Sequence, residues 1–167
     1  MLDNHLWTME PVGREENTIQ GKKYRFTLLT SRLIRMEYRE DGKFEDRPTQ
    51  SVWNRRFEPV AHRLVTEEEG FELFTDHMHV VYSGKPFSKN SLMVKALGGS
   101  HPFGATWYYG EERENLGGTA RTLDDVNGAC KLQNGIQSES GCAVLDDSKS
   151  LILTEDGWIA PRQGDGV

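Results

Sequence analysis

The chain contains 167 residues, enough for one domain with an apolar core but too few for a sandwich plus an eightfold barrel of about 250 residues. Its 20 lysines and arginines and its 26 aspartates and glutamates give a formal net charge of −6, and no basic stripe follows the sequence. This balance argues against nucleic-acid binding. The short apolar runs argue against a membrane span, which needs about 20 apolar residues.

The N-terminal residues Met1–Trp7 have neither a basic leader nor an apolar centre, so they do not predict a secretory signal. The two cysteines, Cys130 and Cys142, are too few for a disulfide framework. Reduced thiols and a cytoplasmic location are the simpler interpretation.

Short β-prone runs separated by turn residues begin at Tyr24–Thr30 and Leu33–Tyr38. In both runs apolar and polar side chains alternate, which places Arg35 and Glu37 on the face opposite to Met36. The same reasoning predicts strands at Ala61–Thr66, Gly70–Thr75, His77–Tyr82, Ser91–Leu97, Trp107–Tyr109, Cys142–Leu145 and Ser150–Thr154. Many short strands with a turn signal every 8–12 residues or so predict an all-β, antiparallel sandwich or barrel.

The stretch Gly110–Gln137 interrupts this pattern, because it is rich in glycine, asparagine and aspartate and too long for a hairpin loop. A long ordered loop on a β scaffold is a usual place for function or for a domain contact. Its glycine-rich segment Leu116–Thr119 precedes no helical pattern. We therefore expect close backbone approach or a positive φ there, rather than a phosphate site.

No catalytic residue, metal site or cofactor is predicted from the side chains. His77 and His79 share one strand face and would bind a metal only if a neighbouring strand supplied a third ligand, so a polar outer face is the favoured interpretation. The pairs Asp124–Asp125 and Asp146–Asp147 lie in turn-like sequence, and neighbouring residues cannot flank a glycosidic bond at the required distance of about 5–5.5 Å.

Four segments carry a resemblance to a known family: Phe44–Gln50, Asn115–Asp124, Gly141–Ser148 and Glu155–Arg162. Together they resemble the region ahead of the catalytic barrel in glycoside hydrolase family 31, the α-glucosidase and α-xylosidase family. The resemblance implies that residues 1–167 form a single N-terminal antiparallel β-sandwich of the galactose mutarotase-like (supersandwich) kind, truncated at its C-terminal end. It also implies that the parent protein is a retaining α-glucosidase-type hydrolase whose catalytic aspartates lie on a (β/α)8 barrel that is absent here.

By the same resemblance, the loop Asn134–Glu139 leans over the barrel mouth, and Gln137, Ser138 and Glu139 either contact the sugar beyond the cleaved bond or only support the loop. The implied partners are the catalytic barrel of the same parent chain and its α-linked oligosaccharide substrate. An open sheet edge in the isolated chain would favour self-association.

Two alternatives remain beside this interpretation. The sandwich could be an independent carbohydrate-binding module, although we expect Trp7, Trp53, Trp107 and Trp158 to serve core packing or a domain interface rather than sugar stacking. It could also be a mutarotase-like sugar epimerase, which would need a histidine acid and a carboxylate base on one concave face.

Overall fold

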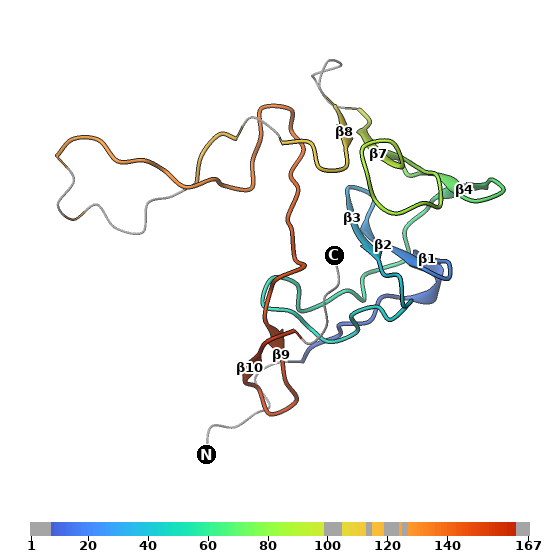
Figure 1. Cartoon of the computed structure of the whole chain (residues 1–167), viewed down its shortest axis with the longest axis horizontal. Helices are drawn as coiled ribbons and strands as arrows, with labels where there is room; N and C mark the ends of the chain where they lie inside the picture. The colour runs from blue at the N-terminus through green and yellow to red at the C-terminus, as the bar shows by residue number, and fades with distance from the viewer. Residues whose placement is uncertain (1–7, 99–104, 113–114, 119–123, 125–126, 163–167) are drawn as a thin grey trace.

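The computed structural model describes residues 8–98, 105–112, 115–118, 124 and 127–162. Within these residues the regular structure is almost entirely β, in three antiparallel sheets (Figure 1). The all-β class and the antiparallel pairing that the sequence predicts are therefore confirmed.

The first sheet has the order β1-β2-β3, with β1 at Thr18–Gln20, β2 at Tyr24–Thr30 and β3 at Leu33–Tyr38. A short 3-10 turn, η2 at Glu15–Asn17, leads into β1. The β2–β3 pairing places Phe26 opposite Met36 on one face and Arg25 opposite Glu37 on the other. One face of this sheet is thus apolar and the other is charged.

The second sheet is a five-stranded meander in the order β4-β5-β6-β7-β8. Its strands are β4 at Arg63–Thr66, β5 at Phe71–Phe74, β6 at Met78–Tyr82, β7 at Leu92–Ala96 and β8 at Thr106–Tyr108. A third, two-stranded sheet pairs β9 at Ile152–Leu153 with β10 at Ile159–Ala160. An isolated bridge between Thr49 and Ile152 joins this sheet to the segment that follows β3.

The core forms where the apolar faces of the first two sheets meet. Phe26 of β2 is fully buried and packs edge-on against Phe71 of β5, with 4.9 Å between the ring centroids. Tyr82 of β6 lies 5.0 Å from Phe26 and 5.0 Å from Tyr24. The buried members of this core are Phe26, Leu28, Phe71, Leu73, Met78, Val80, Tyr82 and Leu92. Two packed layers around one apolar core are the arrangement of a β-sandwich.

The strand predictions hold closely for the first two runs, and the cores of most of the others are strands as expected. The prediction of a strand at Cys142–Leu145 is wrong, because that segment pairs with no described strand and leaves Val144 and Leu145 more than half exposed. Alternating residues form a strand only where a neighbour supplies hydrogen bonds and a surface to cover them. The sequence does not predict the strands β1 and β10, because each is only two or three residues long.

Among the described residues, no helix has both the length and the apolar character that a membrane crossing requires.

Candidate functional site

The long segment after β8 leaves the body of the molecule and returns to it before β9, as the yellow-to-orange trace in Figure 1 shows. Two parts of this segment lie side by side. The amide of Leu116 donates to the carbonyl of Gln137 at 3.1 Å, and the amide of Gly118 donates to the carbonyl of Gln133 at 2.7 Å. An antiparallel bridge joins Asn115 to Ser138. The structure thereby brings two segments that the sequence analysis singled out, Asn115–Asp124 and Asn134–Glu139, into contact through their described residues.

The side chain of Asn115 ties this contact together. Its Nδ2 donates to the carbonyl of Gly135 at 2.7 Å, and its Oδ1 accepts from the amides of Gly117 and Gly135, each at 2.8 Å. Gly117 has a φ of +84°, and a Cβ at Gly135 would lie 2.7 Å from the carbonyl oxygen of Gly117. The expectation of positive φ and close backbone approach in the glycine run is confirmed. Residues 119–123 of the segment Asn115–Asp124 lie outside the described residues.

The three residues predicted to lie near a substrate differ in their surroundings. Gln137 and Glu139 are exposed, whereas Ser138 is buried. The Ser138 hydroxyl donates to the carbonyl of Cys142 and lies 3.0 Å from the hydroxyl of Ser140. Ser138 therefore holds the loop in shape, while Gln137 and Glu139 are the side chains that a ligand could reach.

Replacing Asn115 with alanine should loosen this loop without unfolding the sandwich. The change removes three hydrogen bonds, and at about 1 kcal/mol for a typical hydrogen bond we expect amide exchange at Gly117 and Gly135 to accelerate about tenfold or more. Hydrogen exchange followed by NMR measures this. Asn127→Ala, an exposed change in the same segment, is the matched control, and equal acceleration in both variants would contradict the role given to Asn115.

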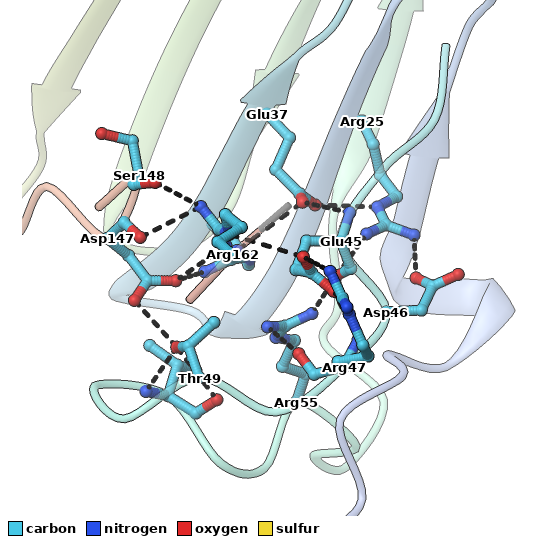
Figure 2. Close-up of polar contacts among 12 residues, drawn as sticks. Arg25, Glu37, Glu45, Asp46, Arg47, Thr49, Arg55, Asp147, Ser148 and Arg162 are labelled. Carbon is cyan, nitrogen blue, oxygen red and sulfur yellow. Dashed lines mark hydrogen bonds and ion pairs between the residues drawn. The ribbon is translucent and has the colours of Figure 1, made fainter. Parts of the chain in front are cut away.

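A second site lies on the charged face of the first sheet. We call it the arginine–carboxylate cluster and define it by Arg25, Arg35, Glu37, Glu45, Asp46, Arg47, Arg55, Asp147 and Arg162, most of which are labelled in Figure 2. The sequence predicts Arg35 and Glu37 on the face opposite to the core. It does not predict that other segments cover that face and leave each side chain with about one-tenth of its area exposed.

Asp147 connects the C-terminal part of the chain to this face. Its Oδ2 accepts from Nη1 of Arg35 at 2.7 Å, and its Oδ1 accepts from the hydroxyl of Thr49 at 2.8 Å. Arg162 donates through Nη1 to the carbonyls of Asp147 and Ser148, at 3.1 and 2.9 Å. Side chains from three distant segments therefore meet at one buried carboxylate.

The other half of the cluster is built around Arg25 and Glu45. Arg25 donates to Glu37 at 2.8 Å and to Asp46 at 2.5 Å. Glu45 accepts from Arg47 at 2.7 Å and lies 3.4 Å from Nε of Arg162. The planar guanidinium group of an arginine binds a carboxylate with a defined geometry. These ion pairs therefore favour one relative position of the chain segments that carry the arginines and the carboxylates.

Acid should weaken the cluster. Burial alone would raise the pKa of Asp147, but hydrogen bonds from Arg35, Thr49 and Ser150 and the Arg35 charge hold the pKa below its usual value. The pKa of Glu45 is likewise lowered, because bonds from Arg47 outweigh the effect of burial. A carboxyl with a depressed folded-state pKa stabilises the fold above its unfolded pKa, near 4, and this contribution is lost as the pH falls through the lower folded value.

We therefore expect the free energy of unfolding to stay level from neutral pH to about pH 5 and to decrease progressively below about pH 4. Urea unfolding at a series of pH values measures it. The double variant Asp147→Asn, Glu45→Gln should show a shallower acid limb than the wild type. A stability that rises as the pH falls from 5 to 3 would contradict this reading of the two carboxyl groups.

The remaining candidate groups of the sequence analysis have ordinary protein partners. His77 lies 2.9 Å from the hydroxyl of Ser31, and His79 lies 2.7 Å from Glu72 and stacks on Phe74. Within the part of the chain that the structure describes, no three histidine, cysteine, aspartate or glutamate side chains gather as a metal-binding group. Cys130 and Cys142 are both free thiols.

The tryptophans fall into two groups. Trp107 is buried, and its indole donates to the carbonyl of Glu111 at 3.0 Å. Trp53 is partly buried, and its indole donates to the carbonyl of Gln50 at 3.3 Å. Trp158 is 72% exposed, so core packing is wrong for this residue. Trp7 lies outside the described residues.

Comparison with known proteins gives no relative: neither the protein-family models nor the curated protein sequences contain a match to this chain.

Proposed function

We propose that this chain is the non-catalytic N-terminal β-sandwich domain of a retaining, α-glucosidase-type hydrolase similar to glycoside hydrolase family 31. In this proposal the sandwich has the galactose mutarotase-like topology, supports a catalytic (β/α)8 barrel of the same parent chain, and contributes the loop Asn134–Glu139 to the binding of an α-linked oligosaccharide. Gln137 and Glu139 would contact the sugar, and Ser138 would hold the loop.

The observation that carries the proposal is that three of the four segments on which the resemblance rests contact one another through charged side chains. Glu45 and Asp46 come from Phe44–Gln50, Asp147 from Gly141–Ser148, and Arg162 from Glu155–Arg162, and all four belong to the arginine–carboxylate cluster. Their interlocking supports an interpretation of the motifs as one structural unit.

The apolar surface of the same region supports a domain contact. The segment between β8 and β9, with the β9–β10 turn, exposes Leu116, Leu132, Ile136, Val144, Leu145 and Trp158, each with about half or more of its area accessible. Exposed apolar side chains in one part of the chain are what a surface covered by another protein part would present. In this proposal the covering part is the barrel.

The gene itself provides the direct test. We expect the coding sequence downstream of codon 167 to encode a (β/α)8 barrel that carries an aspartate nucleophile in a Trp-x-Asp-Met-Asn-Glu-like motif. We also expect the isolated chain to hydrolyse neither aryl α-glucosides nor aryl α-xylosides, while the full-length parent hydrolyses at least one. A stop codon at this point, or turnover by the isolated 167 residues, would contradict the proposal.

The exposure of Trp158 favours one second candidate, an independent carbohydrate-binding module. An exposed indole can stack on a sugar ring and contributes a large apolar contact area. Calorimetric titration with maltose or xylose, repeated with Trp158→Ala, decides between the two candidates, because a pure scaffold releases no saturable heat.

The mutarotase-like alternative gains less support, since His79 and Glu72 are bonded directly to each other at 2.7 Å, which leaves no room between them for a substrate.

Self-association of the isolated chain forms part of the same proposal. The strand β4 lies at an edge of the five-stranded sheet, and all four of its residues are exposed. An uncovered edge offers backbone hydrogen-bonding groups to a second copy. Sedimentation velocity over a range of concentrations measures whether dimers form.

A further inference from the structure

A cleft with a volume of about 370 Å³ lies on the charged face of the first sheet, beside the arginine–carboxylate cluster. Thr18 of β1 pairs with Thr27 of β2, and Gln20 pairs with Arg25. All four residues line the cleft, and their alternation with Phe26 places them on the face opposite to the apolar core. The sheet side of the cleft is therefore polar, and Pro11, Val12 and Gly13 are among the residues that complete its lining.

Arg55 also lines the cleft, and its side chain is unusual in two respects. It is only 2% exposed, and its two terminal nitrogens donate to the backbone carbonyls of Glu45 and Arg47 rather than to carboxylates. Its Nε is buried without a hydrogen-bond partner among the described residues. Neutral carbonyls solvate a cation but do not neutralise it, so this guanidinium is a buried charge with no direct ion pair among the described residues, and the charges of Glu37 and Asp147 attract it without contact.

The charge count of the cluster leads to the same conclusion. Its nine members are five arginines and four carboxylates, which leaves a net formal charge of +1. Burial, together with the nearby Arg35, lowers the pKa of Arg55 to about 10. Buried charges in proteins are normally paired, because an unpaired one loses its hydration without compensation.

We propose that this cleft binds a small oxyanion, a carboxylate or a phosphate group, with Arg55 as its counter-ion. The two acidic residues that line the cleft do not oppose this assignment. Glu15 is exposed to water, which screens its charge, and Asp46 is paired with Arg25 at 2.5 Å. The proposal is independent of the proposed hydrolase function, since it concerns the opposite side of the first sheet from the core and none of the residues Gln137, Ser138 or Glu139.

NMR of arginine Nε–H groups tests the proposal directly on the full chain. Acetate and inorganic phosphate are titrated separately against chloride at constant ionic strength. We expect a saturable shift of the Arg55 Nε–H signal with at least one of the two anions, and the anion that saturates at lower concentration identifies the group. Saturation by neither anion, or equal small shifts at all exposed arginines, would overturn the proposal.

Variants separate a specific site from a general ionic effect. Arg55→Gln should weaken binding by about tenfold or more, the effect of a charge-assisted hydrogen bond. Arg56→Gln removes the same charge from the neighbouring exposed residue and should leave affinity within about twofold. Should Arg55→Gln fail to fold, Glu15→Gln decides: it removes an exposed like charge from the cleft and should tighten binding by about two- to threefold, whereas weaker binding would contradict an anionic ligand.

Discussion

Replacing Asp147 with alanine is expected to lower the free energy of unfolding by about 3–5 kcal/mol, the cost of removing one partner from a buried ion pair. Asp147 is 9% exposed and accepts hydrogen bonds from Arg35 and Thr49. Its loss leaves the guanidinium of Arg35 buried beside Arg162 without their shared counter-ion. Urea unfolding monitored by circular dichroism measures the change.

The neighbouring residue provides a matched control. Asp146 is exposed, and its carboxylate accepts from the amide of Ser148 at 2.9 Å within a turn. Asp146→Ala should cost no more than about 1 kcal/mol, the usual effect of a lost local cap. Equal losses in the two variants would show that the turn, and not the cross-chain ion pair, stabilises this region.

Removing both charges together tests whether the unpaired Arg35 charge causes the loss. In the double variant Arg35→Met, Asp147→Leu both charges are replaced by apolar groups, and such replacements are often neutral or even stabilising. We expect the double variant to be more stable than Asp147→Ala alone. If the double variant is the less stable one, an uncompensated Arg35 charge is not the main cost of Asp147→Ala.

The sequence predicts the sandwich well because local alternation reports which face is buried. Tyr24, Phe26 and Leu28 share one face of a single run, and the structure buries the latter two completely and packs the first against the core. The same alternation places Arg35 on the other face, as observed. Where alternation occurs without a neighbouring strand, as at Cys142–Leu145, the prediction is wrong, because the pattern does not encode the presence of a partner.

The arginine–carboxylate cluster could not be predicted, because its contacts join distant parts of the chain. Arg35 and Asp147 are 112 positions apart, and Asp147 lies in a turn-like segment where an aspartate ordinarily bonds to the local backbone. Asp146 does so, and Asp147 does not. One signal was present in the sequence: charged residues recur within the motif segments themselves, at Glu45, Asp147 and Arg162.

The role of Asn115 was only half visible in the sequence. The glycines around it indicate close backbone approach, and the structure confirms this at Gly117 and Gly135. The partner segment follows only after a long stretch without periodicity, so its register could not be assigned. The hydrogen bonds that Asn115 makes to its own segment and to the partner segment become visible only when the structure puts the two segments side by side.

Replacing Phe26 with alanine is the second change for which we expect a loss of about 3–5 kcal/mol in the free energy of unfolding. Phe26 is fully buried where the two main sheets meet, and its ring contacts those of Phe71 and Tyr82 at centroid distances of 4.9 and 5.0 Å. Alanine removes the contacts that join the layers and leaves a cavity that the rigid sheets cannot close completely.

Phe26→Leu and Phe57→Ala show whether this loss comes from the interface between the sheets. Leucine keeps most of the volume and should cost clearly less than alanine at position 26, about 1–2 kcal/mol. Phe57 is 38% exposed, so its truncation should cost about 1 kcal/mol. Thermal and urea unfolding of the three variants give the order Phe26→Ala, Phe26→Leu, Phe57→Ala from largest to smallest loss. A loss for Phe57→Ala as large as that for Phe26→Ala would contradict a core in which the β2 face closes on the five-stranded sheet.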